Sequence, residues 1–300
     1  MHLINNSLAR LSCYAASIGL VSAAVIVPTT VSALPIAGGV TVRFDGTGSH
    51  TVKLGPTTQQ TCFLSGLSGD FRGIPTIYTD PIKKSILAVA EVVEDKGFWV
   101  LHLDGGTGAG VGASAICIFA TANRADTSWS NNGTGGSLPA TPNRHCFLSA
   151  VFASTGFGAP VWGAKKPAAL SIHEPTAKNS AFILDGVVHN VGGDQDYGGG
   201  AMRCVDFTAT SQWGFTLAGP SNAANSATNT ITLRNSPNGP AVPVANVGCF
   251  LTGIVGTWAS PSPDPLGLVD GVFLTGDPKV SKNWKLTASN GRTGTVRCFR

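Results

Sequence analysis

The sequence is short of charged residues, and glutamate is the scarcest of them. Lysine, arginine, aspartate and glutamate make up 12% of the 300 residues, about half of the usual ~25%. Only Glu91, Glu94 and Glu174 are glutamates. This composition is poor for helices, and the 38 glycines favour strands joined by turns. A hydrophobic content of 43% is enough for packed cores, so global disorder is not expected.

The sequence also lacks a basic stripe and metal-type cysteine spacing. The net charge is only +4, and Lys83-Lys84 and Lys165-Lys166 are the only adjacent basic pairs. This pattern is typical of a solvated surface and argues against a nucleic-acid partner. No Cys-x-x-Cys and no paired Cys/His spacing is present, so neither a metal site nor a cofactor is expected.

Only the N-terminus carries an apolar run suited to export or membrane insertion. Arg10 precedes an apolar stretch over 11–27, and Val31-Ser32-Ala33 supplies a small-x-small cleavage site. We predict a signal peptide over 1–33, a secreted or cell-envelope protein, and no membrane span after its removal. A retained membrane anchor is the alternative, which Pro28 and the shortness of the run disfavour.

The sequence does contain a threefold internal repeat. Cys-Phe-Leu-Ser/Thr occurs at 62–65, 146–149 and 249–252, and an aromatic segment follows each copy at nearly the same distance. These segments centre on Trp99, Phe182 and Trp284, and each unit then closes with a second cysteine. Such a repeat sets the architecture. It predicts three units, at 34–117, 118–204 and 205–300.

The repeat also predicts how the cysteines pair. Cleavage after Ala33 removes Cys13 and leaves six cysteines, an even number typical of disulfides in exported proteins. Because the chain ends two residues after Cys298, the third unit lies upstream of that residue. Pairing within units then gives Cys62–Cys117, Cys146–Cys204 and Cys249–Cys298.

Strands are predicted inside the units. Residues 40–44 alternate apolar and polar side chains, as a strand does, and residues 45–48 are of the types found in turns. A second strand-like segment follows over 51–54, so this order predicts a hairpin. Residues 80–96 look helical by themselves. The aligned segments in the other two units carry a proline that would interrupt a helix. We therefore predict a strand over 86–93, paired in a hairpin with the aromatic strand, and keep a helical insertion as the alternative.

Two glycine-rich segments resemble ligand loops, but turns explain both. Residues 108–113 match Gly-x-Gly-x-x-Ala, yet a strand and a predicted disulfide follow instead of a helix. Residues 194–198 have the acidic spacing of a calcium loop without the later bidentate carboxylate.

Catalytic motifs are absent. Neither Gly-x-Ser-x-Gly nor His-Glu-x-x-His occurs. His102 and Asp104 would share one side of a strand and could act as an acid–base pair, but no nucleophile motif accompanies them. Glu91 and Glu94 form a conceivable carboxylate pair that the other units do not repeat. We expect no enzymatic activity.

Four tryptophans are the candidate ligand-binding residues. They lie among Ser, Asn, Gly and Pro residues, and exposed indoles in turns are good stacking platforms for sugar rings. The alternative is that they cover the edge of a β core. These residues are Trp129, Trp162, Trp213 and Trp258.

The order Cys-Phe-Leu-Ser/Thr, hairpin, aromatic-x-Leu, glycine-rich turn and Ala-x-Cys resembles repeat segments in bacterial exported proteins and phage tail-fibre-like proteins. The matching residues run from Cys62 to Cys117, with two further copies. The resemblance implies a structural signature and no particular activity.

We predict an all-β protein of three tandem disulfide-bonded β repeats. They are expected to form small sandwich-like modules, with pseudo-threefold packing as the alternative arrangement. The function expected is binding of glycans or a cell surface. A structural or surface-coat protein without a small ligand and an extracellular hydrolase are the alternatives.

Overall fold

The computed structural model describes residues 36–44, 49–69, 88–105, 111–130, 135–153, 168–187, 198–219, 228–234, 240–244, 247–256, 271–276, 282–289 and 291–300. Strands dominate these ranges, and they contain no α-helix. It follows that none of the described segments is a helix suited to crossing a membrane. The all-β prediction is confirmed. The predicted signal peptide over 1–33 lies outside the described residues.

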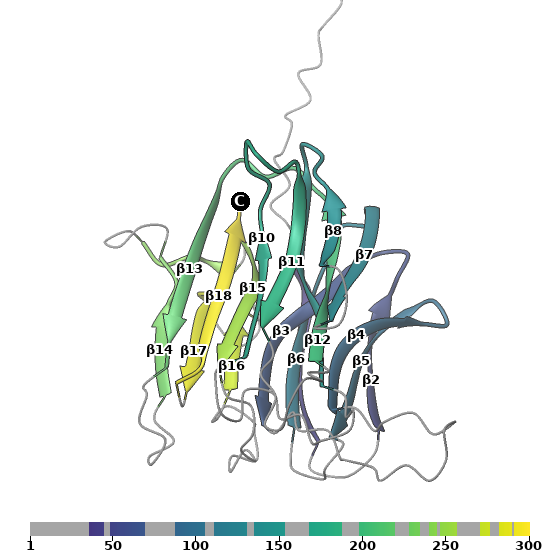
Figure 1. Ribbon diagram of the computed structural model, residues 1–300. Coiled ribbons are helices and arrows are strands. Elements are labelled where there is room, and N and C mark those ends of the chain that lie inside the picture. Colours follow the sequence, from purple (N-terminus) through teal and green to yellow (C-terminus); the bar gives the residue numbers. More distant parts are fainter. Residues whose placement is uncertain are drawn as a thin grey trace, which may run out of the picture. The chain divides into compact units, whose positions relative to one another are not determined.

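Each repeat contributes six strands in the same order (Figure 1). The first repeat forms β1 (Ile36–Phe44), β2 (Ser49–Pro56), β3 (Thr61–Gly69), β4 (Ala88–Asp95), β5 (Phe98–Gly105) and β6 (Val111–Ile118). The second forms β7 (Ala122–Ser130), β8 (Gly136–Pro139), β9 (Arg144–Ala153), β10 (Ala168–His173), β11 (Ala181–Val187) and β12 (Gly198–Asp206). The third forms β13 (Gln212–Ala218), β14 (Thr228–Thr232), β15 (Gly248–Gly256), β16 (Gly271–Thr275), β17 (Lys285–Ser289) and β18 (Thr293–Phe299).

The six strands of a repeat divide into two antiparallel halves. In the first repeat one half has the order β1-β6-β3 and the other β2-β5-β4, and the other repeats follow the same scheme. The halves of one repeat pack against each other. Leu170 of β10 approaches the Gly200 backbone of β12 so closely that a Cβ atom would not fit there. In the third repeat Val272 and Leu286 approach Gly294 in the same way. Each repeat is therefore a small two-layer sandwich.

These sandwiches are not separate, because each half-sheet pairs through one of its strands with a half-sheet of a neighbouring repeat. Strand β3 pairs with β16, β9 pairs with β4, and β15 pairs with β10. The result is three six-stranded sheets in which the repeats are linked cyclically, first to second, second to third, and third back to first. This is the pseudo-threefold packing that the sequence left open as the alternative arrangement of the sandwich-like modules. The cyclic pairing leaves the Cys-Phe-Leu strands β3, β9 and β15 in the sheet interiors.

The predicted hairpin between residues 40–44 and 51–54 is wrong, although both segments are strands. Strand β1 pairs with β6 in one sheet, and β2 pairs with β5 in another. Alternating polarity identifies a strand without identifying its partner. The other hairpin prediction is confirmed, since β4 pairs with β5 through a turn at Lys96 and Gly97 in which both residues have positive φ. Residues 80–87, where the helical alternative would begin, lie outside the described residues.

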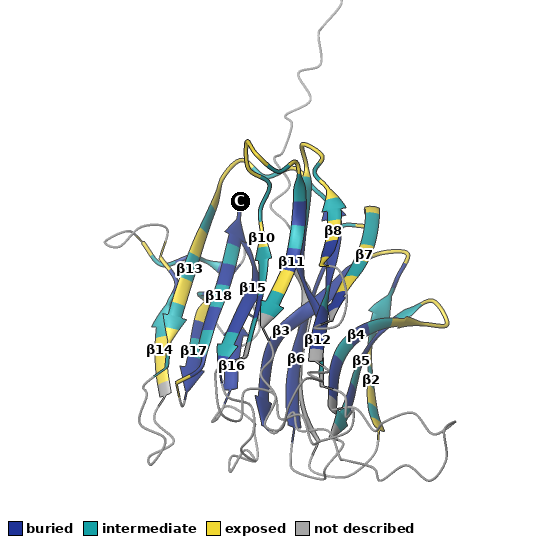
Figure 2. Cartoon of the chain, in the orientation of Figure 1, coloured by how far each residue is buried: buried dark blue, intermediate teal, exposed yellow. Residues whose placement is uncertain are grey.

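The three disulfides join the residues that the repeat predicts. Each connects the Cys-Phe-Leu strand to the last strand of its own repeat, with the two cysteines directly opposite each other. The bonds are Cys62–Cys117, Cys146–Cys204 and Cys249–Cys298. All six cysteines are buried, and the strands that Figure 2 labels β3, β6 and β15 are drawn largely in dark blue.

The three repeats meet at a cluster of equivalent phenylalanines. Phe63, Phe147 and Phe250 each follow the first cysteine of a repeat, and all three are fully buried. Their ring centroids are 4.9 Å apart for Phe63–Phe147, 5.6 Å for Phe63–Phe250 and 4.2 Å for Phe147–Phe250. These spacings are those of favourable aromatic pairs. The phenylalanine of the repeated motif thus joins the repeats to one another.

The aromatic strand is tied to the Cys-Phe-Leu strand within a repeat. The indole N–H of Trp99 donates to the Gln60 carbonyl at 2.5 Å, and that of Trp284 donates to the Val247 carbonyl at 2.7 Å. Gln60 and Val247 each lie two residues before the first cysteine. Phe182 holds the equivalent place in the second repeat and has no such donor. The repeated aromatic residue is therefore structural.

A half-buried histidine beside this core makes stability depend on pH. His145 stacks on Phe207, with ring centroids 4.3 Å apart, and meets the ring of Phe299 at 4.5 Å. Burial lowers the pKa of His145 from 6.5 to about 4. Between these values the unfolded chain binds a proton that the folded chain does not, so stability falls as the pH falls from about 6.5 toward 4. After allowance for partial exposure, we expect a loss of about 2 kcal/mol.

Denaturant unfolding at pH 7 and pH 4 measures this loss, and His145→Gln is the control. Because glutamine does not titrate, the variant should lose less stability than the unmodified protein over the same interval. Equal losses in both proteins would show that carboxylates, and not His145, set the acid sensitivity.

Candidate functional site

The described tryptophans do not form exposed platforms. Trp129 lies on strand β7, not on a turn, and is only 7% exposed. Its ring covers Gly186 of β11, where a Cβ atom would clash with it. The expectation of an open stacking surface is therefore wrong for Trp129. The missing side chain of Gly186 explains how an indole in a polar sequence context becomes part of the core.

Trp213 lies on β13, an edge strand of its sheet. It is half-buried and packs against the core. Its indole nitrogen is buried without a hydrogen-bond partner among the described residues. Trp162 and Trp258 lie outside the described residues, so their predicted roles stay predictions.

A group of chemically active side chains lies on the half-sheet β2-β5-β4 of the first repeat. The strand register places Thr51, His102 and Glu91 directly opposite one another on three neighbouring strands. Ser49 and Asp104 form the next pair along β2 and β5. Side chains at alternate positions of a strand point to the same face. The five residues therefore share one face.

Two hydrogen bonds organise this face. The Oγ atom of Ser49 lies 2.6 Å from Nε2 of His102, and Nδ1 of the same imidazole lies 2.8 Å from Oε1 of Glu91. The His102 and Glu91 side chains are 27% and 30% exposed, and Ser49 is exposed. A carboxylate accepts, so Nδ1–H donates to Glu91. In neutral His102 this leaves the Nε2 lone pair to accept the Ser49 hydroxyl.

The carboxylates around the imidazole favour its protonated form. The hydrogen bond that His102 donates to Glu91 raises the pKa of His102 above its ordinary value of 6.5. Partial burial opposes that effect, and the charges of Glu91 and Asp104 reinforce it. His102 therefore keeps its proton to a higher pH than a free imidazole does.

The other two repeats carry different polar groups at the position of His102. Counting from the repeated aromatic residue, this position is Asp185 in the second repeat and Thr287 in the third. Asp185 is exposed, and the Thr287 hydroxyl lies 2.9 Å from that of Thr230 on β14. The fold thus presents three equivalent half-sheets, each with its own polar chemistry.

Sequence reasoning found part of this cluster and missed the rest. His102 and Asp104 were predicted to share a face, as they do. A carboxylate pair of Glu91 and Glu94 was conceivable but not expected. In the structure Glu91 accepts a hydrogen bond from His102, whereas Glu94 accepts from Thr57 at 3.5 Å. Ser49 was missed because it lies 53 residues from His102. Strand alternation in 49–54 was the only available signal, and it does not name the partner strand.

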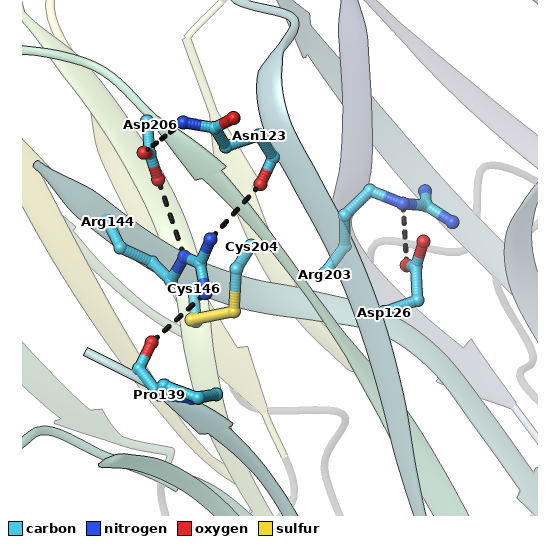
Figure 3. Close-up of a disulfide and its surroundings, with 8 residues drawn as sticks. All are labelled: Asn123, Asp126, Pro139, Arg144, Cys146, Arg203, Cys204 and Asp206. Carbon is cyan, nitrogen blue, oxygen red and sulfur yellow. Dashed lines mark hydrogen bonds and ion pairs between the residues drawn. A yellow bond between two sulfur atoms is a disulfide. The ribbon is translucent and has the colours of Figure 1, made fainter. Parts of the chain in front are cut away.

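Charged residues elsewhere hold the repeats together. Arg203 forms an ion pair with Asp126 at 2.7 Å (Figure 3). It also donates to the Cys62 carbonyl at 2.9 Å and lies 4.1 Å from the Trp99 ring. It therefore connects the second repeat to the first. Arg297 holds the equivalent position in the third repeat.

Arg297 makes the corresponding connection to the second repeat, through an ion pair with Glu174 at 2.6 Å. A further network surrounds the Cys146–Cys204 disulfide, where Arg144 and Asn123 both contact Asp206 (Figure 3). These contacts join strands, so we assign these charged residues to packing.

The remaining motifs give no site. Strand β6 begins at Val111, so the Gly-x-Gly segment does not open a helix, and its glycines at 108 and 110 lie outside the described residues. Residues 194–197 lie outside them as well. Within the described ranges no cluster of three His, Cys, Asp or Glu residues could hold a metal.

No protein-family model matches the chain, and a comparison with curated proteins finds no match either. The functional argument therefore depends on the geometry of the half-sheets.

Proposed function

We propose that the protein is a secreted, disulfide-stabilised module that binds glycans or a cell surface. Three disulfides are compatible with an oxidising, extracellular environment. The observation that carries the binding proposal is the polar outer position shared by the three half-sheets, at His102, Asp185 and Thr287. Hydroxyl, imidazole and carboxylate groups are the hydrogen-bonding partners that a hydroxyl-rich ligand requires.

Rigidity supports this assignment. His102 is hydrogen bonded on both sides, and Thr287 is hydrogen bonded to Thr230, so these groups are oriented before a ligand arrives. Preorganised groups lose less side-chain freedom on binding. The disulfide of each repeat joins strands of the other half-sheet, against which the half that carries these groups packs.

Cyclic repetition supplies several weak sites in one body. Linked sites can raise the overall affinity by about 10²–10⁴ without new contacts. A repetitive surface, such as a polysaccharide or a cell envelope, could engage more than one half-sheet at once. A single small sugar could not, which favours extended ligands.

Binding to a glycan array and to whole cells tests the proposal. Asp185→Ala and Thr287→Val should each weaken binding about fivefold, corresponding to one lost hydrogen bond. The double variant should weaken multivalent binding by more than the two single effects combined. Gln212→Ala, at an exposed position of β13, is the matched control and should bind as the unmodified protein does. Unchanged binding in the double variant would contradict the proposal.

A further inference from the structure

Beyond binding, we infer that Ser49 is a nucleophile activated by His102 and Glu91, and that it reacts with activated esters. No sequence motif identifies this nucleophile, since nucleophile, base and carboxylate come from three different strands. Their order in space, hydroxyl to imidazole to carboxylate, is the arrangement that activates a serine.

The distances satisfy the requirements for that role. Ser49 Oγ lies 2.6 Å from His102 Nε2, and His102 Nδ1 lies 2.8 Å from Glu91 Oε1. Both separations fall within the ~2.6–3.2 Å expected for a nucleophile–base contact. Each nitrogen of the imidazole has one of the two partners, so the Glu91 contact fixes the tautomer that leaves Nε2 as the base.

The Ser49 hydroxyl is also accessible, and its two partners are held on paired strands. Ser49 is exposed and lies on the edge strand β2, so an electrophile can approach its hydroxyl. His102 and Glu91 lie on the paired strands β5 and β4, which are directly opposite in register. A site on paired strands is held more precisely than a site on loops.

The arrangement is not a requirement of the fold. In the third repeat Thr230 and Thr287 occupy the places of Thr51 and His102, and their hydroxyls contact each other. In the second repeat Asp185 replaces the histidine. The same half-sheet therefore forms without the serine–histidine–glutamate chain, which separates its chemistry from its packing.

The reaction balances with an ester and water alone. The Ser49 oxygen adds to the carbonyl carbon while its proton passes to His102 Nε2, and Glu91 stabilises the resulting imidazolium. Collapse of the tetrahedral intermediate breaks the bond to the leaving group, which takes the proton and departs as an alcohol. Water then attacks the acyl-serine, giving its proton to His102. Release of the carboxylic acid returns that proton to Ser49.

The strength of the base and the charges around Ser49 indicate which class of substrate reacts. General-base assistance supplies about 10²–10⁴-fold, enough for an ester with a good leaving group and far too little for an amide. The charged groups on this face are Glu91, His102 and Asp104, with Lys53 and Asp95 further along the strands. Carboxylates outnumber cations close to Ser49, which favours neutral or cationic esters over anionic ones.

Covalent labelling of the full chain tests the inference. A fluorophosphonate and p-nitrophenyl acetate are the probes, and peptide mass mapping locates the adduct. We expect modification at Ser49, complete loss in Ser49→Ala, and at least about 100-fold slower labelling in His102→Gln. Glu91→Gln should slow labelling about tenfold, which corresponds to one charge-assisted hydrogen bond.

The matched control is Ser128→Ala. Ser128 is also an exposed serine, on β7 at the opposite edge of the same sheet, and its loss should leave the labelling rate unchanged. The rate should rise with pH through the pKa of His102, because only the neutral imidazole accepts the proton. His102→Gln should abolish that dependence, which a purely structural role would not produce.

Two results would overturn the inference: no Ser49 adduct in the unmodified protein, or an adduct that forms equally fast in His102→Gln. Circular dichroism and non-reducing mass mapping of each variant establish that the fold and the disulfides are intact. His102→Asn is a second substitution in case glutamine disturbs the sheet. Glycan binding is measured separately, so either proposal can fail without the other.

Discussion

Replacing both Cys249 and Cys298 with alanine should lower the free energy of unfolding by about 4 kcal/mol. The bond closes a loop with a sequence separation of 49 and restrains the unfolded chain accordingly. Alanine is preferred to serine because both sites are fully buried and a hydroxyl there would add its own cost. Denaturant titration of the variant beside the unmodified protein gives the difference directly.

The other two disulfides provide the comparison. Their sequence separations are 55 and 58, and loop-closure entropy changes slowly with length, so the three losses should agree to within a few tenths of a kcal/mol. A much smaller loss for one pair would mean that its loop keeps structure in the unfolded chain. Losses below about 1 kcal/mol for all three pairs would contradict the loop-closure account.

The disulfides and the repeat could be predicted from the sequence because the same segment occurs three times. A single copy leaves the pairing of Cys62 open, and three aligned copies restrict it. The repeat also decided the conformation of β4, whose own residues suggest a helix. Prolines in the aligned segments disfavoured a helix, and the structure forms the strand Ala88–Asp95.

The pairing of strands between repeats could not be predicted in the same way. Strand β3 pairs with β16 across more than two hundred residues, and no local pattern specifies that contact. The same limit produced the wrong hairpin between β1 and β2 and hid the contact between Ser49 and His102. Polarity alternation identifies the face that a side chain occupies, but the partner strand comes from packing across the whole sheet.

The central cluster predicts the other large effect. Phe147→Ala should destabilise the protein by about 4 kcal/mol, the usual cost of removing a buried phenylalanine ring. Phe147 is fully buried and contacts Phe63 and Phe250 from the other two repeats. It also lies 5.5 Å from Phe299, so the cavity would be bordered by rings held in the two other sheets. The surrounding residues can fill such a cavity only in part, so the loss of stability stays large.

The cyclic arrangement also predicts that the stabilities of the repeats are coupled to one another. If Phe147 and Phe250 join the second and third repeats, the double alanine variant should deviate from additivity by about 0.5–3 kcal/mol. Phe119→Ala is the control, since its side chain is 52% exposed and should change stability by no more than about 0.5 kcal/mol. All variants should unfold in one transition, because the sheets are shared between repeats. Additive losses with separate transitions for each repeat would show that the repeats fold independently.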